Sequence, residues 1–211
     1  MKTRSKALLL SLCAVLLVAA SVFGTMAYLT STDKVTNTFS VGSVSITLDE
    51  KDVDNDGNTE DNVTVNDVVR DKANSYKLMP GHTYVKDPTV HVNASSEDSW
   101  IFVKVENGIS AYEAATSEEG DNKTIAGQIT ANGWKKLENV DDVYYKEYTK
   151  NENGMDLVVF ESFKIADNAN EVEGWTSIKT ESTKINVTAY AVQKDGFDTA
   201  AEAWDATFGN K

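Results

Sequence analysis

The chain has 211 residues with a single cysteine, and its formal net charge is −13 at pH 7. An acidic surface repels nucleic acids and anionic lipids, so the composition argues against a protein that binds either partner. One cysteine cannot form an intrachain disulfide, so the fold must depend on a hydrophobic core, which a chain of this length can form.

The N-terminus has the features of a secretory signal peptide in the expected order. A positively charged start precedes residues 7–23, which are uncharged and rich in Leu, Val and Ala. The charges come from Lys2, Arg4 and Lys6. This order predicts an exported protein in which residues 1–27 are a signal peptide helix and residues 28–211 form one domain.

The junction after the apolar run predicts where the signal peptide is cut. The residues at Thr25 and Ala27 fit the positions that a signal peptidase reads, so cleavage is expected before Tyr28. Cys13 would leave with the peptide. The alternative is an uncleaved membrane anchor, because residues 7–29 are long enough to span a bilayer. We expect no other contact with a membrane.

The rest of the chain has the pattern of β-strands separated by acidic or Gly/Asn loops. We expect Val90 and Val92 to face inward and His91 outward, and residues 100–105, apolar on both faces, to form a central strand. The expected strands are residues 35–41, 44–48, 63–69, 83–92, 100–105, 134–137, 143–148, 157–165 and 184–192. Many short strands with few helices predict a mainly β, antiparallel sandwich.

Two short helices complete the expected elements. The first covers residues 123–132 and is expected to be capped near Asp121. The second follows a capping box formed by Thr199 and Glu202, and Gly209 should end it. Its predicted apolar face consists of Phe197, Ala201, Trp204 and Phe208.

An acidic stretch resembles the start of a calcium-binding loop. Three alternate aspartates precede Gly57, so their oxygens are placed to converge on one ion while the glycine permits a sharp turn. The aspartates are Asp52, Asp54 and Asp56. The twelfth position is Val63, where a calcium loop has Glu, so Glu60 or Asp61 would have to close the site. The alternative is a solvated hairpin tip.

Enzyme motifs are absent from the sequence. The two histidines, His82 and His91, lack the spacing of a zinc protease helix, and there is no Gly-x-Ser-x-Gly motif. The histidines would bind a metal only if Glu97 or Asp98 joined them, and two ordinary surface histidines are the simpler interpretation. We therefore expect no catalytic site.

Three segments resemble the TasA/camelysin-like family of secreted proteins. Residues 20–33, which include Gly24-Thr25-Met26-Ala27, are similar to the family's signal peptide junction. Residues 37–48 look like its first strand, and residues 77–87 contain its L-x-P-G-x-x-x-x-K turn. The resemblance covers roughly residues 7–105.

This resemblance implies a fold, a processing enzyme and a location. The fold would be a jelly-roll-like β-sandwich, the peptidase a SipW-type signal peptidase of a Gram-positive bacterium, and the location a biofilm matrix or the cell surface. Camelysin is classed as a metallopeptidase, so a secreted metallopeptidase with unrecognised ligands is one alternative function. A calcium-stabilised adhesion module is another.

Cleavage before Tyr28 would free a β-rich segment attached at one end only. Residues 28–41 would then be able to pair with an open sheet edge of their own domain or of another subunit. Pairing with another subunit is a head-to-tail contact that does not close, and it builds a filament. The sequence therefore predicts self-assembly or assembly with related matrix subunits.

Overall fold

The computed structural model describes residues 6, 11–18, 43–57, 70–114, 124–178 and 183–209. The chain divides into two units, Met1–Val41 and Gly42–Lys211. In the first unit residues 11–18 are helical, and their large apolar side chains are exposed. No helix in the described ranges has both the length and the apolar character needed to cross a membrane.

Several predicted features lie outside the described residues. These are the cleavage positions Thr25, Ala27 and Tyr28, the strands at 35–41 and 63–69, and the calcium-loop residues Glu60, Asp61 and Val63.

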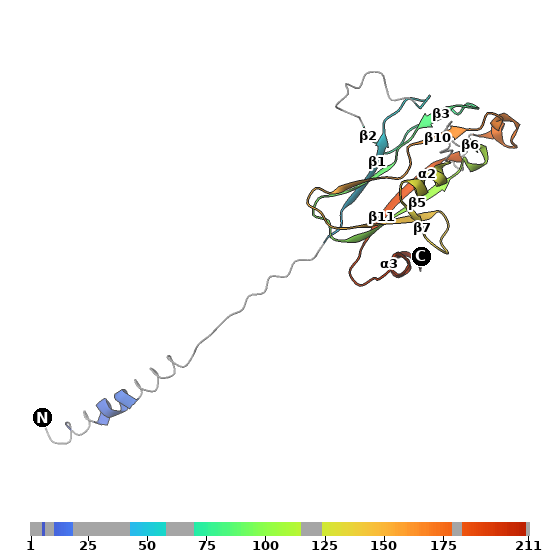
Figure 1. Ribbon diagram of the computed structural model, residues 1–211. Coiled ribbons are helices and arrows are strands. Elements are labelled where there is room, and N and C mark those ends of the chain that lie inside the picture. The colour runs from blue at the N-terminus through green and yellow to red at the C-terminus, as the bar shows by residue number, and fades with distance from the viewer. Residues whose placement is uncertain are drawn as a thin grey trace. The chain divides into compact units, whose positions relative to one another are not determined.

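The second unit is mainly β, as predicted, with eleven strands in three antiparallel sheets within the described ranges (Figure 1). The first sheet has the order β2 (Arg70–Asp71), β1 (Ile46–Lys51), β4 (Thr89–Val92) and β9 (Met155–Val158). The second has the order β3 (Thr83–Val85), β10 (Ser162–Ile165) and β6 (Glu113–Ala114). The third has the order β11 (Ile185–Gln193), β5 (Ser99–Asn107), β8 (Val143–Tyr148) and β7 (Lys135–Lys136).

Two α-helices and three 3₁₀ helices are found in the described ranges of this unit. They are α2 (Ile125–Ala131), α3 (Ala200–Phe208), η1 (Ser110–Tyr112), η2 (Ala169–Glu171) and η3 (Trp175–Ser177). The strands expected at residues 134–137 and 143–148 correspond to β7 and β8, which pair with each other as an antiparallel hairpin.

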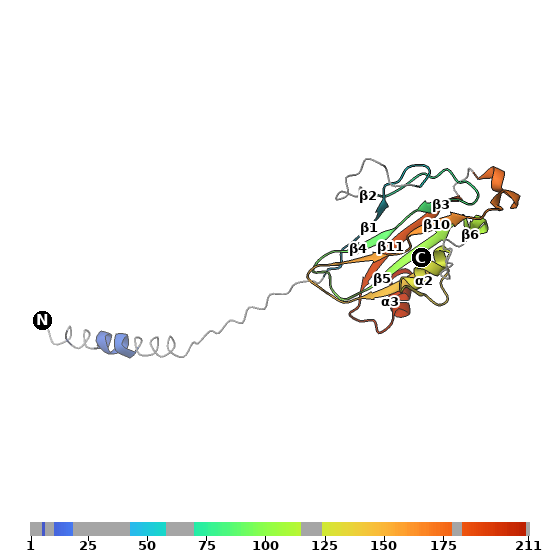
Figure 2. The same ribbon diagram turned by 45° about the horizontal axis from the view of Figure 1, so that its top comes forward.

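Strand β5 is the predicted central strand with two apolar faces. Ile101 and Val103 point into the main core, whereas Trp100 and Phe102 belong to a second core on the opposite face. Helix α3 covers that second core with Trp204, whose ring centroid lies 5.1 Å from that of Phe102 (Figure 2). A strand buried on both faces reads as a continuous apolar run, and so the sequence indicated its position.

The main core lies against the inner faces of the sheets. Val90 and Val92 are buried in it, and His91 is on the outer face, as predicted. Tyr84 stacks on Phe163 with ring centroids 4.9 Å apart and interplanar angle 13°. Tyr84 on β3 and Phe163 on β10 face each other within the second sheet, and both side chains join the main core together with Val90 of the first sheet and Ile101 of the third.

Two strands predicted as continuous are each split in the structure. Residues 83–92 divide into β3 and β4, and residues 157–165 give the end of β9 and then β10. The two breaks face each other: Lys86 N donates to Glu161 O, and Val159 N donates to Pro88 O. The pairing register is the same on both sides, so this is one antiparallel ladder that bends where Pro88 lacks a donor.

The helix predictions need two corrections. Helix α2 is capped by Thr124, whose side chain accepts from Gly127 N, and not near Asp121. In α3 the predicted Ala201 is exposed, while Ala200 and Ala203 are buried. The error arose because Phe197 was used to define the helical face.

Phe197 precedes the helix and does not share its periodicity, although it does pack against the second core. The capping box of Thr199 and Glu202 and the C-cap at Gly209 are confirmed.

Candidate functional site

Strands β1 and β11 lie beside each other, and no hydrogen-bonded ladder joins them in the described part of the chain. Strand β11 is the edge of the third sheet. Lys194 N donates to Asp98 O, and Gly108 N donates to Lys184 O. These two hydrogen bonds identify the residues of β11 whose backbone groups bond to β5. Because these bonds alternate along an antiparallel pair, Ile185 and Val187 direct their N–H and C=O groups away from β5.

Strand β1 presents a similar edge. Asn93 N donates to Ser45 O, so in the β1–β4 ladder Ile46 and Leu48 direct their backbone polar groups away from β4. Strand β2 pairs only with the last two residues of β1. We call the space between the free parts of β1 and β11 the seam.

A cavity of about 1050 Å³ extends along the seam. Its apolar lining includes Leu48, Tyr76, Phe163, Trp175, Ile185 and Val187. Two strand edges with apolar pockets between them are the features that bind an extended peptide, because main-chain bonds give affinity and alternate side chains fill pockets. The seam therefore has the chemical features of a strand-binding site, although β1 and β11 approach within 8 Å of each other at some Cα pairs and would have to separate to admit a strand between them.

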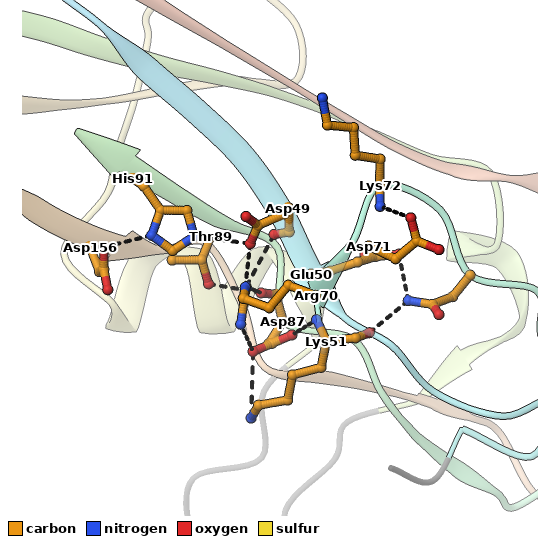
Figure 3. Close-up of polar contacts among 11 residues, drawn as sticks. Asp49, Glu50, Lys51, Arg70, Asp71, Lys72, Asp87, Thr89, His91 and Asp156 are labelled. Carbon is orange, nitrogen blue, oxygen red and sulfur yellow. Dashed lines mark hydrogen bonds and ion pairs between the residues drawn. The ribbon is translucent and has the colours of Figure 1, made fainter. Parts of the chain in front are cut away.

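A network of charged side chains crosses the outer face of the first sheet (Figure 3). His91 on β4 lies between two carboxylates, with Nδ1 2.6 Å from Asp156 Oδ1 and Nε2 2.9 Å from Asp49 Oδ1. Arg70 on β2 continues the network, because it bonds to Asp49 and its Nη1 lies 3.2 Å from Asp87 Oδ2. The network thus joins all four strands of this sheet with the segment after β3.

The charge state of His91 follows from its two partners. Only an imidazolium has two N–H groups to donate, one to each carboxylate. Partial burial lowers the pKa of His91, but the hydrogen bonds and charges of Asp49 and Asp156 outweigh it, so the net pKa is raised. Burial raises the pKa of Asp49, but Arg70 and His91 lower it more.

A second polar cluster lies on the inner side of β1, in the cavity wall. Lys86 and Glu50 form an ion pair in which both residues are buried, with 7% and 5% of their surface exposed. Asn74 Nδ2 donates to the other oxygen of the same carboxylate over 2.9 Å. The side chain of Asn74 also accepts from Val53 N over 3.1 Å. We call Glu50, Asn74 and Lys86 the buried triad after its two buried members, Glu50 and Lys86; Asn74 itself is half-buried.

The aspartates of the predicted calcium loop form a backbone-braced turn. Gly57 N donates to Asp54 O, and Asp56 N donates to Asp54 Oδ1 over 3.0 Å. Gly57 has φ +78°, and a Cβ there would lie 2.6 Å from the ring of Tyr84. Asp52 and Asp56 are exposed. No group of three metal-ligating side chains is found among the described residues, and calcium binding by this turn stays a prediction.

The two histidines are not brought together on a metal site with Glu97 or Asp98. His82 Nε2 contacts Asp56 O at 2.8 Å, whereas His91 belongs to the outer network. Both acidic residues contact Lys150: its Nζ donates to Glu97 and its backbone N to Asp98.

Sequence reasoning missed the partners that complete both polar clusters, above all Arg70, Asn74 and Lys86. One signal was present in the sequence. Lys86 and Asp87 are adjacent charges between two extended runs, and such charges need partners when their neighbours are buried.

Comparisons with protein-family models, with curated proteins and with solved structures found no match.

Proposed function

We propose that the protein is a secreted structural subunit of a Gram-positive biofilm matrix or cell surface. In this proposal a SipW-type signal peptidase cuts before Tyr28, and the freed residues 28–41 insert into the seam of a second copy. The support from sequence is the junction that resembles the TasA/camelysin-like family. That resemblance also underlies the expected jelly-roll-like arrangement of the sandwich, whereas the expectation of no catalytic site rests on the enzyme motifs that the sequence lacks.

The observation that carries the proposal is the seam. Ile46 and Leu48 on one side and Ile185 and Val187 on the other direct backbone donors and acceptors toward it. A strand that parted β1 from β11, which now lie in contact, would gain main-chain hydrogen bonds on both sides and cover apolar side chains that line the cavity.

Residues 28–41 have the length and pattern that this role requires. At about 3.3 Å per residue the segment is longer than the nine-residue strand β11. Val35, Phe39 and Val41 fall on one face of an extended chain and supply apolar side chains for the cavity. Because the segment is joined to its own domain at one end, insertion into a neighbour leaves that neighbour's segment free, and the chain of contacts continues.

The experiment compares the processed protein with a variant that lacks residues 28–40. Electron microscopy should show filaments for the first and none for the second, while circular dichroism and sedimentation show a compact fold for both. Filaments formed by the truncated protein would contradict the proposal. A processed protein that stays monomeric, with its segment protected from protease, would show that the segment closes its own seam.

A pair of substitutions on β11 tests the edge itself. Val187→Pro removes an N–H that the β5 ladder does not use, so the domain should still fold but filaments should be lost. Val187→Ala is the matched control, because it shortens the same side chain and keeps the N–H. Equal assembly by both variants would exclude this edge as the docking site.

A further inference from the structure

The buried triad joins a primary amine, a carboxamide and a carboxylate in one enclosed place. Glu50 uses one oxygen for Lys86 Nζ and the other for Asn74 Nδ2. The amine and the carboxamide are therefore neighbours held by a single carboxylate. Tyr76 lies against them, with Lys86 Nζ 5.9 Å from its ring centroid.

We propose that this triad forms a covalent cross-link, in which Lys86 Nζ becomes joined to Asn74 Cγ by an amide bond with Glu50 as the catalytic acid and base. The inference is independent of how the protein assembles.

Each member of the triad has the chemistry that its role needs. Charged groups are costly to bury, and a proton passed from Lys86 to Glu50 leaves a neutral amine and a neutral acid in their place. The neutral amine is a nucleophile. Val53 N–H donates to Asn74 Oδ1 and so polarises the carbonyl under attack; it also stabilises the negative charge that develops on this oxygen.

The reaction balances without any other reactant. Lys86 Nζ forms a bond to Asn74 Cγ, and the carbonyl electron pair moves to Oδ1. Glu50 gives its proton to Asn74 Nδ2, the Cγ–Nδ2 bond breaks, and the carbonyl re-forms. The leaving ammonia takes the remaining proton of the amine as ammonium. No group is oxidised or reduced, and the cavity, which the triad lines, gives the product a space to enter.

The place of the triad in the fold gives the cross-link a mechanical use. Asn74 holds the segment after β2, because its Nδ2 also donates to Lys51 O over 2.8 Å. Lys86 lies at the bend of the long ladder, where its backbone N donates to Glu161 O. A bond between Lys86 and Asn74 would join the segment after β2, which lines the cavity, to the bend between the first and second sheets.

Mass spectrometry of the purified wild-type protein under denaturing conditions tests the proposal. We expect an intact mass lower than the sequence mass by one ammonia. After trypsin, residues 73–77 should be found joined to a peptide that begins at residue 78 and remains uncut after Lys86. An unmodified mass, or an ammonia loss that maps to a linear peptide with a cyclised asparagine, would overturn the proposal.

Variants distinguish the residues that take part in the reaction from residues that only line the cavity. Glu50→Gln keeps the shape of the side chain but cannot accept the proton, so the cross-linked peptide should disappear. Lys72→Arg, at another cavity-lining lysine, should leave the cross-link intact. A cross-link that persists in Glu50→Gln would overturn the catalytic role of Glu50. The wild-type peptide map remains decisive if this variant fails to fold.

Discussion

Asp49 and Glu50 are adjacent on β1, yet they belong to two different electrostatic environments. Asp49 points outward into the network with Arg70 and His91, where the side chains of all three are about a quarter exposed. Glu50 points inward and is 5% exposed beside Lys86. Because side chains alternate along a strand, β1 places a partly solvated network on its outer face and a buried ion pair on its inner face. The same types of charge should contribute much more to the free energy of unfolding in the buried pair.

The largest expected effect comes from breaking the inner cluster. Compared with wild-type protein in which Lys86 has not been cross-linked, Lys86→Met leaves Glu50 buried without its cation, which should lower the free energy of unfolding by about 3–5 kcal/mol in chemical denaturation. The double variant Glu50→Leu/Lys86→Met removes both charges and should recover much of the loss. A single variant that loses only the 0–1 kcal/mol of a surface ion pair would show that the inner cluster is no different from the outer one.

Removing Arg70 tests the outer network. Arg70→Leu removes hydrogen bonds to Asp49 and Asp87 and should cost about 1–3 kcal/mol of unfolding free energy, less than the inner substitution. The loss relative to wild type should shrink as salt is raised, because the network is partly solvated. Lys104→Leu breaks an exposed pair with Glu106 and serves as the control with no measurable change.

The protonation of His91 should make stability depend on pH. Its pKa is raised in the folded protein, so its contribution is fully present below the ordinary histidine pKa of about 6.5. That contribution is lost as the pH rises through the raised value. Thermal unfolding should therefore shift to lower temperature over this window. His91→Gln should flatten the dependence, and an unchanged slope would assign it to another group.

The smallest expected effect concerns the three aspartates of the acidic turn, which belong neither to the outer network nor to the buried triad. If Asp52, Asp54 and Asp56 bind calcium, the melting temperature should rise slightly with calcium and not with magnesium. Asp54→Asn should remove that rise. An identical transition with calcium and with chelator would leave the turn as a solvated hairpin tip.

Local patterns predicted the parts of the fold that depend on neighbours in sequence. Two examples are the run at Trp100 and Phe102, which is apolar on both faces of its strand, and the capping box at Thr199. Each is recognisable from a few consecutive residues. The bend at Pro88 was missed because residues 83–92 were interpreted as one extended strand in spite of the charged residues and the proline in its middle. The hydrogen bond between the side chains of Asn74 and Glu50 joins two separate segments of the chain, and hydrophobic periodicity carries no information about such a contact.

The candidate site was predictable to the same limited extent. The sequence predicted a free N-terminal segment, but it could not show that β1 and β11 lie beside each other with no common ladder among the described residues. Whether two strand edges share a ladder depends on which strands become neighbours. The packing of the whole core determines those neighbours, and no local pattern records it.

The two-faced strand β5 also has a consequence for export. Helix α3 follows β5, β8 and β11 in the chain, and it alone brings Trp204 over Trp100 and Phe102. A chain that crosses the membrane N-terminus first therefore presents this aromatic face to water before its cover has emerged. In the proposed export, the rate at which α3 emerges would therefore determine whether this aromatic face is buried within its own domain or binds another molecule.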